Sequence, residues 1–149
     1  MFDDVISFDS FPAGHRVAEL FEAARAVKDR AYAPYSHFPV GAAILSPGGR
    51  IHVGCNVENA AYPVGSCAEA GAIAAMVAAG DLRIEALLTI CDSEEVGTCC
   101  GGCRQRVREF AALDTPVYAA GPRGVRAVFT MESLLPTSFG PDNLRGFVS

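Results

Sequence analysis

Three cysteines in two short motifs carry the clearest chemical signal in this chain. Cys67 follows Ser66 at the start of an apolar run, and Cys100 and Cys103 form a Cys-x-x-Cys pair farther along. Three thiolates are one protein ligand short of a closed zinc site, and a fourth position left to water is typical of catalytic zinc. Glu69 lies two residues after Cys67, close enough to handle the protons of that water. The pattern predicts zinc on Cys67, Cys100 and Cys103, with Glu69 as proton carrier.

Each motif also has a purely structural interpretation. Ser66 and Glu69 have the spacing of a capping box, in which the two side chains bond free amides at a helix start. A Cys-x-x-Cys pair can be redox-active or form one half of a zinc ribbon. A ribbon needs four ligands, whereas the third sulfur here comes from a single cysteine. The combination favours the catalytic site, in which Glu69 could cap the helix and transfer protons together.

Composition bounds the class of protein. The chain has 149 residues, half of them hydrophobic and 19% charged, which suits one domain over residues 1–149 with a sizeable core. A net charge of −5 without a basic cluster argues against nucleic acid as a partner and favours a small neutral substrate. Acidic residues near the N-terminus do not suit a signal peptide, and the apolar stretch 72–79 is too short to span a membrane. We therefore expect a cytoplasmic protein with reduced thiols.

Hydrophobic periodicity predicts alternating helices and strands. An amphipathic helix should start at Val17 and end before the loop 31–39, and a third helix should run from Cys100 to about residue 112. The second helix, about 67–79, is apolar nearly all round, so we expect it to be buried on every side. Strands are predicted at 40–45, 51–57, 84–91, 116–120 and 125–129, with antiparallel pairing of the first two and of the last two. These elements predict an α/β fold, a three-layer α/β/α sandwich around a five-stranded mixed sheet.

Five segments follow one another along the chain in a recognisable order: Tyr35–Ala43, Gly54–Pro63, Cys67–Glu69, Cys100–Gln105 and Leu134–Pro141. Through these segments the chain resembles, over nearly its whole length, the small, homotetrameric type of cytidine deaminase. The resemblance implies zinc on the three cysteines and Glu69 as the proton shuttle, which is the arrangement of zinc deaminases. It further implies hydrolytic deamination of cytidine and 2′-deoxycytidine, with release of ammonia and no organic cofactor.

The resemblance also implies contacts with a nucleoside substrate. Asn56 and Glu58 correspond to the ribose-binding pair of the family, and they are two residues apart, so they can point to the same side of a strand end. Phe38 corresponds to an aromatic residue that packs against the base, and Ala68 to a backbone contact with the base edge. Without the resemblance, Asn56 would be a turn residue and Phe38 would pack within its loop.

An oligomer is expected on two grounds. The helix over 67–79 has too many apolar faces for one small domain to cover. The resemblance implies a homotetramer with shared active sites, to which Tyr62 and Phe139 contribute from neighbouring subunits. Without the resemblance, Phe139 would simply anchor the C-terminal segment.

Two positions depart from the family pattern. Cys99 stands where family members commonly have proline, so either of two adjacent thiols could bind, and the Cys-x-x-Cys spacing favours Cys100. Ala70 stands where many members carry an arginine that donates to the ligand thiolates. Three thiolates on Zn²⁺ leave a net charge of −1, which helix ends or another arginine must offset. Arg104 is the candidate, because it lies one residue after a ligand at a helix start.

Two other functions remain as alternatives. The protein could deaminate another cytosine-containing compound such as a nucleoside antibiotic, although Asn56 and Glu58 favour a ribose. It could instead be a non-catalytic binding module that zinc stabilises, although the presence of Glu69 argues against this.

Overall fold

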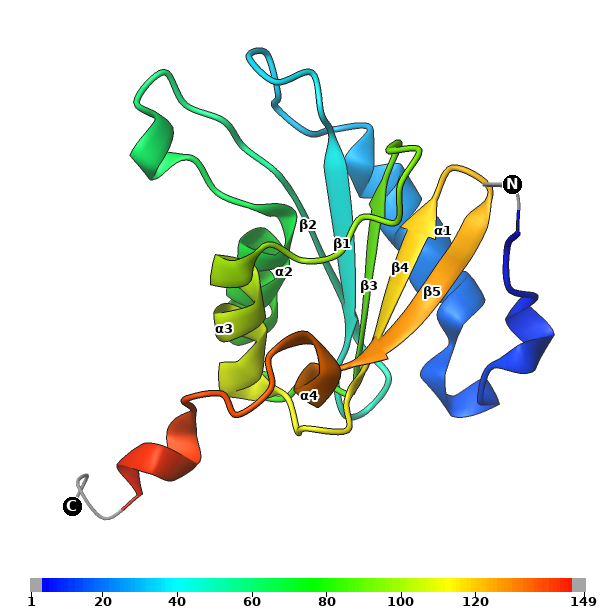
Figure 1. Ribbon diagram of the computed structural model, residues 1–149, viewed down its shortest axis with the longest axis vertical. Coiled ribbons are helices and arrows are strands. Elements are labelled where there is room, and N and C mark those ends of the chain that lie inside the picture. The colour runs from blue at the N-terminus through cyan, green and yellow to red at the C-terminus, as the bar shows by residue number, and fades with distance from the viewer. Residues whose placement is uncertain (1–3, 146–149) are drawn as a thin grey trace.

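Helices cover both faces of a five-stranded sheet in the computed structural model, which describes residues 4–145 (Figure 1). The strands are β1 (Val40–Leu45), β2 (Ile51–Cys55), β3 (Ala86–Cys91), β4 (Pro116–Gly121) and β5 (Gly124–Thr130). The helices are α1 (Val17–Lys28), α2 (Ala68–Ala78), α3 (Gly101–Phe110) and α4 (Met131–Leu134). Short 3-10 turns occur at Phe8–Ser10, Ala13–His15, Tyr62–Val64 and Pro141–Leu144. The predicted helices and strands are confirmed, whereas α4 and the 3-10 turns were not anticipated.

The sheet is mixed, with the strand order β2-β1-β3-β4-β5. The two predicted hairpins, β1 with β2 and β4 with β5, are antiparallel, and β1 also pairs antiparallel with β3. Only β3 and β4 are parallel among these strands. A parallel pair needs a long crossover connection, and here it contains α3. The crossover therefore carries Cys100 and Cys103 over the sheet.

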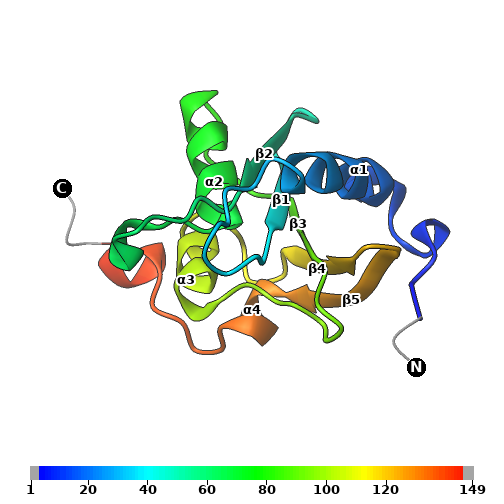
Figure 2. The ribbon, with the colours of Figure 1, turned by 90° about the horizontal axis from the view of Figure 1, so that it is seen from above.

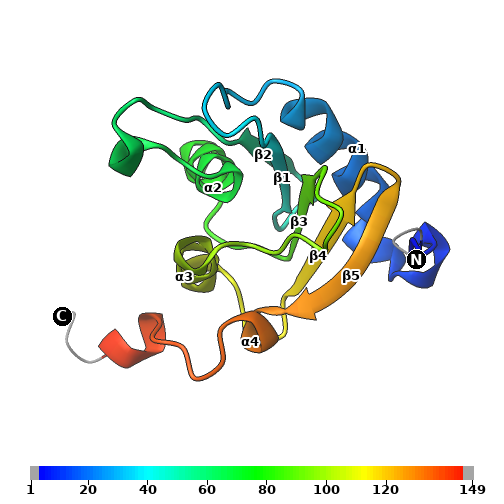
Figure 3. The ribbon, with the colours of Figure 1, turned by 45° about the horizontal axis from the view of Figure 1, so that its top comes forward.

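The three layers are clear in two further views, with α1 on one side of the sheet and α2 and α3 on the other (Figures 2 and 3). Alternate residues of β1 enter two separate cores: Ala43 and Leu45 pack with α1, whereas Ala42 and Ile44 pack with α2 and α3. This alternation is the period of a strand buried on both faces. The predicted α/β/α sandwich is confirmed.

Gly54 lets β2 lie directly against α2. A Cβ atom on Gly54 would lie 2.2 Å from the Ala72 nitrogen and 2.4 Å from the Ala68 oxygen. Only a residue without a side chain allows such a close backbone approach. The first turn of α2 is therefore fixed to the sheet by its main chain.

Two predicted strand bounds differ from the structure. Strand β2 ends at Cys55 rather than at Val57, because Val57 instead forms bridges with Tyr32 and Ser66 outside the sheet. Strand β3 begins at Ala86 rather than at Ile84, which makes an isolated bridge with Ala111.

Burial in two helices does not follow simply from the hydrophobic pattern. Lys28 belongs to the polar face by periodicity, yet it is buried because its ammonium group pairs with Asp92 at 2.5 Å. In the single chain α2 keeps one exposed side, on which Val77 is 41% exposed, so the expected burial on every side would need a neighbouring subunit. No helix in residues 4–145 is both long and apolar enough to cross a membrane.

Candidate active site

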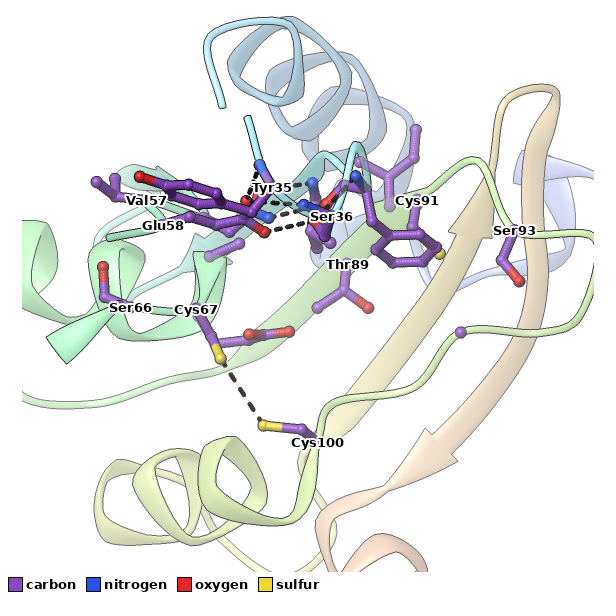
Figure 4. A pocket seen from close by; sticks show the side chains of 18 of the residues that line it. Tyr35, Ser36, Val57, Glu58, Ser66, Cys67, Thr89, Cys91, Ser93 and Cys100 are labelled. Carbon is purple, nitrogen blue, oxygen red and sulfur yellow. Dashed lines mark hydrogen bonds between the residues drawn. The ribbon is translucent and has the colours of Figure 1, made fainter. Parts of the chain in front are cut away.

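The sulfur atoms of Cys67, Cys100 and Cys103 meet where α2 and α3 begin. Figure 4 shows the sulfurs of Cys67 and Cys100 facing each other. All three lie within 4.8 Å of one another, and the Cys67 and Cys100 sulfurs are 3.8 Å apart. Tetrahedral zinc with Zn–S bonds of about 2.3 Å separates two sulfurs by about 3.8 Å. Cys67 and Cys100 are the N-caps of the two helices, so both helix dipoles favour thiolates here. The donor set and its spacing fit zinc.

The thiols are not equally easy to ionise in the protein alone. Burial chiefly raises the pKa of Cys67. Burial, followed by the nearby Glu69 carboxylate, raises the pKa of Cys103. Burial acts in the same direction on Cys100, but hydrogen bonds from the Cys103 backbone and from the other two thiols lower its pKa overall. A coordinated cation deprotonates a thiol outright, so the cluster becomes a set of thiolates when metal binds.

Glu69 lies in the first turn of α2 and is 5% exposed. The N-cap of α2 is Cys67, without any side-chain capping bond, so the capping-box interpretation of Ser66 and Glu69 is wrong. The carboxylate instead lines the pocket beside the sulfur cluster. It therefore interacts with the Cys103 thiol and faces the space in which a molecule could bind.

The adjacent cysteine, Cys99, lies outside the cluster. Its side chain is 3% exposed and packs into the hydrophobic core beneath α2 and α3. Burial strongly raises the pKa of its thiol. Of the two neighbouring thiols, the structure brings Cys100 to the other ligands, as the motif spacing predicts.

The arginine that contacts the cluster is Arg106, so the expectation for Arg104 is wrong. The Arg104 guanidinium donates to the backbone oxygens of Cys99 and Leu134, each at 2.8 Å. Arg106, two residues farther along α3, places Nη1 3.6 Å from the Cys103 sulfur. One helical turn separates Arg106 from Cys103, a spacing at which side chains meet. This i,i+3 relation was the available sequence signal.

A pocket of about 710 Å³ opens over the cluster. This volume lies in the range of small-molecule sites. Glu69, Cys67 and Cys100 line this pocket. Most of the predicted substrate contacts line it as well, namely Phe38, Asn56, Glu58, Tyr62 and Ala68. Phe139 does not line the pocket of its own chain.

Asn56 and Glu58 organise the loop that carries Phe38. The Asn56 amide donates to the Phe38 oxygen at 2.8 Å and accepts from the Val40 amide at 2.8 Å. Glu58 accepts from the backbone amides of Tyr35 and Ser36, and also from the Ser36 hydroxyl (Figure 4). The Ser36 hydroxyl and amide, more than Tyr35, lower the pKa of Glu58. The rim of the pocket therefore carries an ionised carboxylate.

Two predicted contacts extend away from the body of the chain. Tyr62 is 75% exposed and Phe139 is 60% exposed. The segment around Tyr62 and the C-terminal segment both project from the sheet in Figure 1. The Gln105 amide donates to the Phe139 oxygen at 2.9 Å, so α3 also supports the C-terminal segment.

Thr89 is a pocket residue that belongs to none of the sequence motifs. It belongs to β3, is 4% exposed, and lines the pocket with the cysteines (Figure 4). A hydroxyl within an otherwise apolar strand was the signal that could have found it.

A buried carboxylate beside three thiols, at two helix starts in an α/β/α sandwich, defines the class of zinc-dependent hydrolytic enzymes. Residues 15–119 match the family described as the cytidine and deoxycytidylate deaminase zinc-binding region. The chain therefore belongs to this family, as the sequence resemblance predicts.

Individual relatives agree with this assignment. A cytidine deaminase of Sporosarcina psychrophila is 39% identical over 128 residues, which cover 86% of this chain and 94% of that protein. A cytidine deaminase of Mycobacterium tuberculosis is 40% identical over 118 residues, covering 76% and 82%. The crystal structure of cytidine deaminase from Burkholderia pseudomallei matches with a TM-score of 0.77 at 38% identity, covering 82% of this chain and 98% of that one.

Proposed function

We propose that this protein hydrolyses cytidine and 2′-deoxycytidine to uridine and 2′-deoxyuridine with release of ammonia. The observation that carries the proposal is the buried Glu69 carboxylate beside the three-cysteine cluster, inside a pocket of nucleoside size. Membership of the deaminase family supports the same reaction. The products would place the protein in pyrimidine salvage, and six free cysteines support a reducing cytoplasm.

Glu69 moves the protons in this reaction. Zinc held by Cys67, Cys100 and Cys103 supplies a Lewis acid that makes water nucleophilic near neutral pH. The Glu69 carboxylate accepts a proton as water adds to C4 of the pyrimidine, and it delivers this proton to N3. It then takes the second proton of the added hydroxyl to the amino group, so that the C4–N bond breaks and ammonia leaves. Water and cytidine are thereby converted to uridine and ammonia.

The remaining pocket residues orient the nucleoside. Phe38 offers its ring to the base, and the Ala68 backbone lies next to Glu69, where it can bond the base edge. An ionised carboxylate has about four acceptor sites, and Glu58 uses three of them, so one is left for a ribose hydroxyl. Asn56 holds the Phe38 loop in place and contributes from the same strand end.

The active unit in this proposal is a homotetramer whose sites are shared. The exposed apolar surface of α2, which includes Val77, supports an interface there, as do the projecting rings of Tyr62 and Phe139. Phe139→Ala should raise the KM for cytidine several-fold if the ring enters a neighbour's pocket. A monomer by light scattering at assay concentration, with full activity, would defeat this part of the proposal.

An ultraviolet assay tests the reaction directly. Zinc-loaded protein should deaminate cytidine and deoxycytidine, and it should act poorly on cytosine, which lacks the sugar, and on cytidine monophosphate. Preference for another cytosine compound would instead identify a deaminase of, for example, a nucleoside antibiotic. Zinc-replete protein that deaminates no cytosine compound would indicate a binding module.

A further inference from the structure

Thr89 presents a hydroxyl group within the floor of the pocket. It is the fourth residue of β3, a strand in which every residue is buried. Its side chain is drawn among the pocket-lining residues, with Cys67 and Cys100 also labelled (Figure 4). Thr89 is the one polar side chain of this strand, and its exposed fraction is 4%.

The hydroxyl oxygen of Thr89 has no hydrogen-bond partner among residues 4–145. Within the same part of the chain, every fully buried side-chain oxygen or nitrogen atom has a hydrogen-bond partner. Both facts hold together because the Thr89 oxygen is not sealed: it opens into the pocket that the residue lines. A nearly buried hydroxyl without a partner costs stability, which a bound molecule or water would recover.

Thr89 faces the same side of the sheet as the cysteine cluster, and its neighbours across the sheet are apolar. Its partners across the sheet are Ala42 on β1 and Ala119 on β4, and neither side chain can accept or donate a hydrogen bond. Because Ala42 packs with α2 and α3, Thr89 lies on the sheet face that carries the cysteine cluster. The polar groups at the pocket rim, Asn56 and Glu58, belong instead to the end of β2 and its neighbouring loop.

We propose that Thr89 binds the substrate by a hydrogen bond between its hydroxyl and the pyrimidine base. This inference rests on the proposed function, which brings C4 of the base to the metal cluster and leaves the sugar to the rim. A hydroxyl both donates and accepts. It can therefore pair with polar atoms of the cytosine ring and of the uracil ring that replaces it. A chain with an apolar residue here would lose this contact with substrate and product alike.

Two substitutions separate the hydroxyl of Thr89 from its methyl group. Thr89→Val keeps the shape and removes the hydroxyl, so kcat/KM for cytidine should fall by roughly tenfold, the worth of one hydrogen bond. The same factor should appear with deoxycytidine and in the inhibition constant of uridine, because all three carry a pyrimidine base. Thr89→Ser keeps the hydroxyl and should recover most of the loss. The melting temperature of Thr89→Val should equal or exceed that of the native protein, because an unpartnered polar group is removed.

Three results obtained with catalytically active protein would overturn this inference. Thr89→Val could keep full kcat/KM, or Thr89→Ser could lose as much as Thr89→Val, which would assign the effect to packing of the methyl group. A lower melting temperature of Thr89→Val would indicate a structural hydrogen bond within the chain. If native protein deaminates no nucleoside, the proposed function fails separately. Calorimetric titration with uridine then decides on Thr89, since equal affinities of native and Thr89→Val protein would overturn its role.

Discussion

The two ends of α2 both carry polar side chains, but only one end satisfies them internally. Just beyond the C-terminal end, Asp81 accepts from the Ser46 hydroxyl at 2.6 Å, contacts His52 Nε2 at 3.0 Å and pairs with Arg50. At the N-terminal end, Cys67 has other sulfurs as neighbours, and Glu69 lines an open pocket. Buried polar groups with complete partners stabilise a fold, whereas those with unused bonding capacity are available for chemistry. The completeness of the hydrogen bonding therefore distinguishes the structural cluster around Asp81 from the functional cluster around Cys67 and Glu69.

The largest expected effect comes from removing a ligand at the N-terminal end. Cys67→Ala, Cys100→Ala and Cys103→Ala should each lose zinc and activity, because three protein ligands leave no redundancy. Cys99→Ala is the matched control and should keep one zinc per chain, since its sulfur lies in the core. Metal analysis of the purified variants measures this. Zinc loss in Cys99→Ala together with retention in Cys100→Ala would reverse the ligand assignment.

Glu69→Gln should have the next largest effect. The variant keeps a polar side chain of similar size but removes the proton carrier, so turnover should fall by at least about a hundredfold. Zinc content and melting temperature should change little, because Glu69 forms no helix cap. Steady-state kinetics, metal analysis and calorimetry on one preparation test this. Near-normal turnover with a lowered melting temperature would make Glu69 a structural residue like Asp81.

The two arginines of α3 sharpen the comparison further. Arg106→Gln removes a positive charge from the Cys103 sulfur, so zinc affinity should fall by roughly tenfold, as is usual for partners of metal ligands. Arg104→Gln releases two backbone carbonyls instead, so it should lower the melting temperature and affect zinc less. Competition with a chromophoric chelator measures zinc affinity in both variants. If native protein and Arg106→Gln bind zinc with equal affinity, the helix ends rather than Arg106 offset the negative charge of the three thiolates.

The smallest effect is expected at the C-terminal end of α2. Hydrogen bonds from Ser46, then Arg50 and His52, hold the pKa of Asp81 well below its usual value. Its ionised form therefore stabilises the fold fully above the pKa of the unfolded chain, about 4, and this contribution is lost as pH falls toward the folded value. Asp81→Asn should lower the melting temperature at pH 7 without changing zinc content, and the difference should narrow below about pH 4. The exposed Asp114→Asn serves as control, and an Asp81→Asn variant as stable as this control would contradict the assignment.

Local patterns predicted the fold and the metal site because each signal lies within a few residues. The Cys-x-x-Cys pair marks the start of α3. The strand alternation and the short connections predict the antiparallel pairs β1–β2 and β4–β5. Arg106 and Thr89 were missed because their roles depend on neighbours brought in by folding. Within residues 4–145 the hydroxyl of Thr89 has no partner, and its neighbours across the sheet, Ala42 and Ala119, have no side-chain group that could provide one. The exposed side of α2 agrees with the expectation that one domain cannot cover this helix, but the apolar pattern does not say which surface of another chain would cover it.

The main-chain contact at Gly54 determines how this site can change through mutation. Where side chains separate a helix from a sheet, a substitution is absorbed by altered rotamers, and the helix keeps its place. Gly54 leaves no such layer, so any added atom must displace the Ala68 end of α2 as a whole. Cys67 and Glu69 would then shift together relative to Cys100 on α3, which is carried by a different connection. New substrate preferences are therefore more accessible through the loops 31–39 and 92–99, which border the pocket without this constraint.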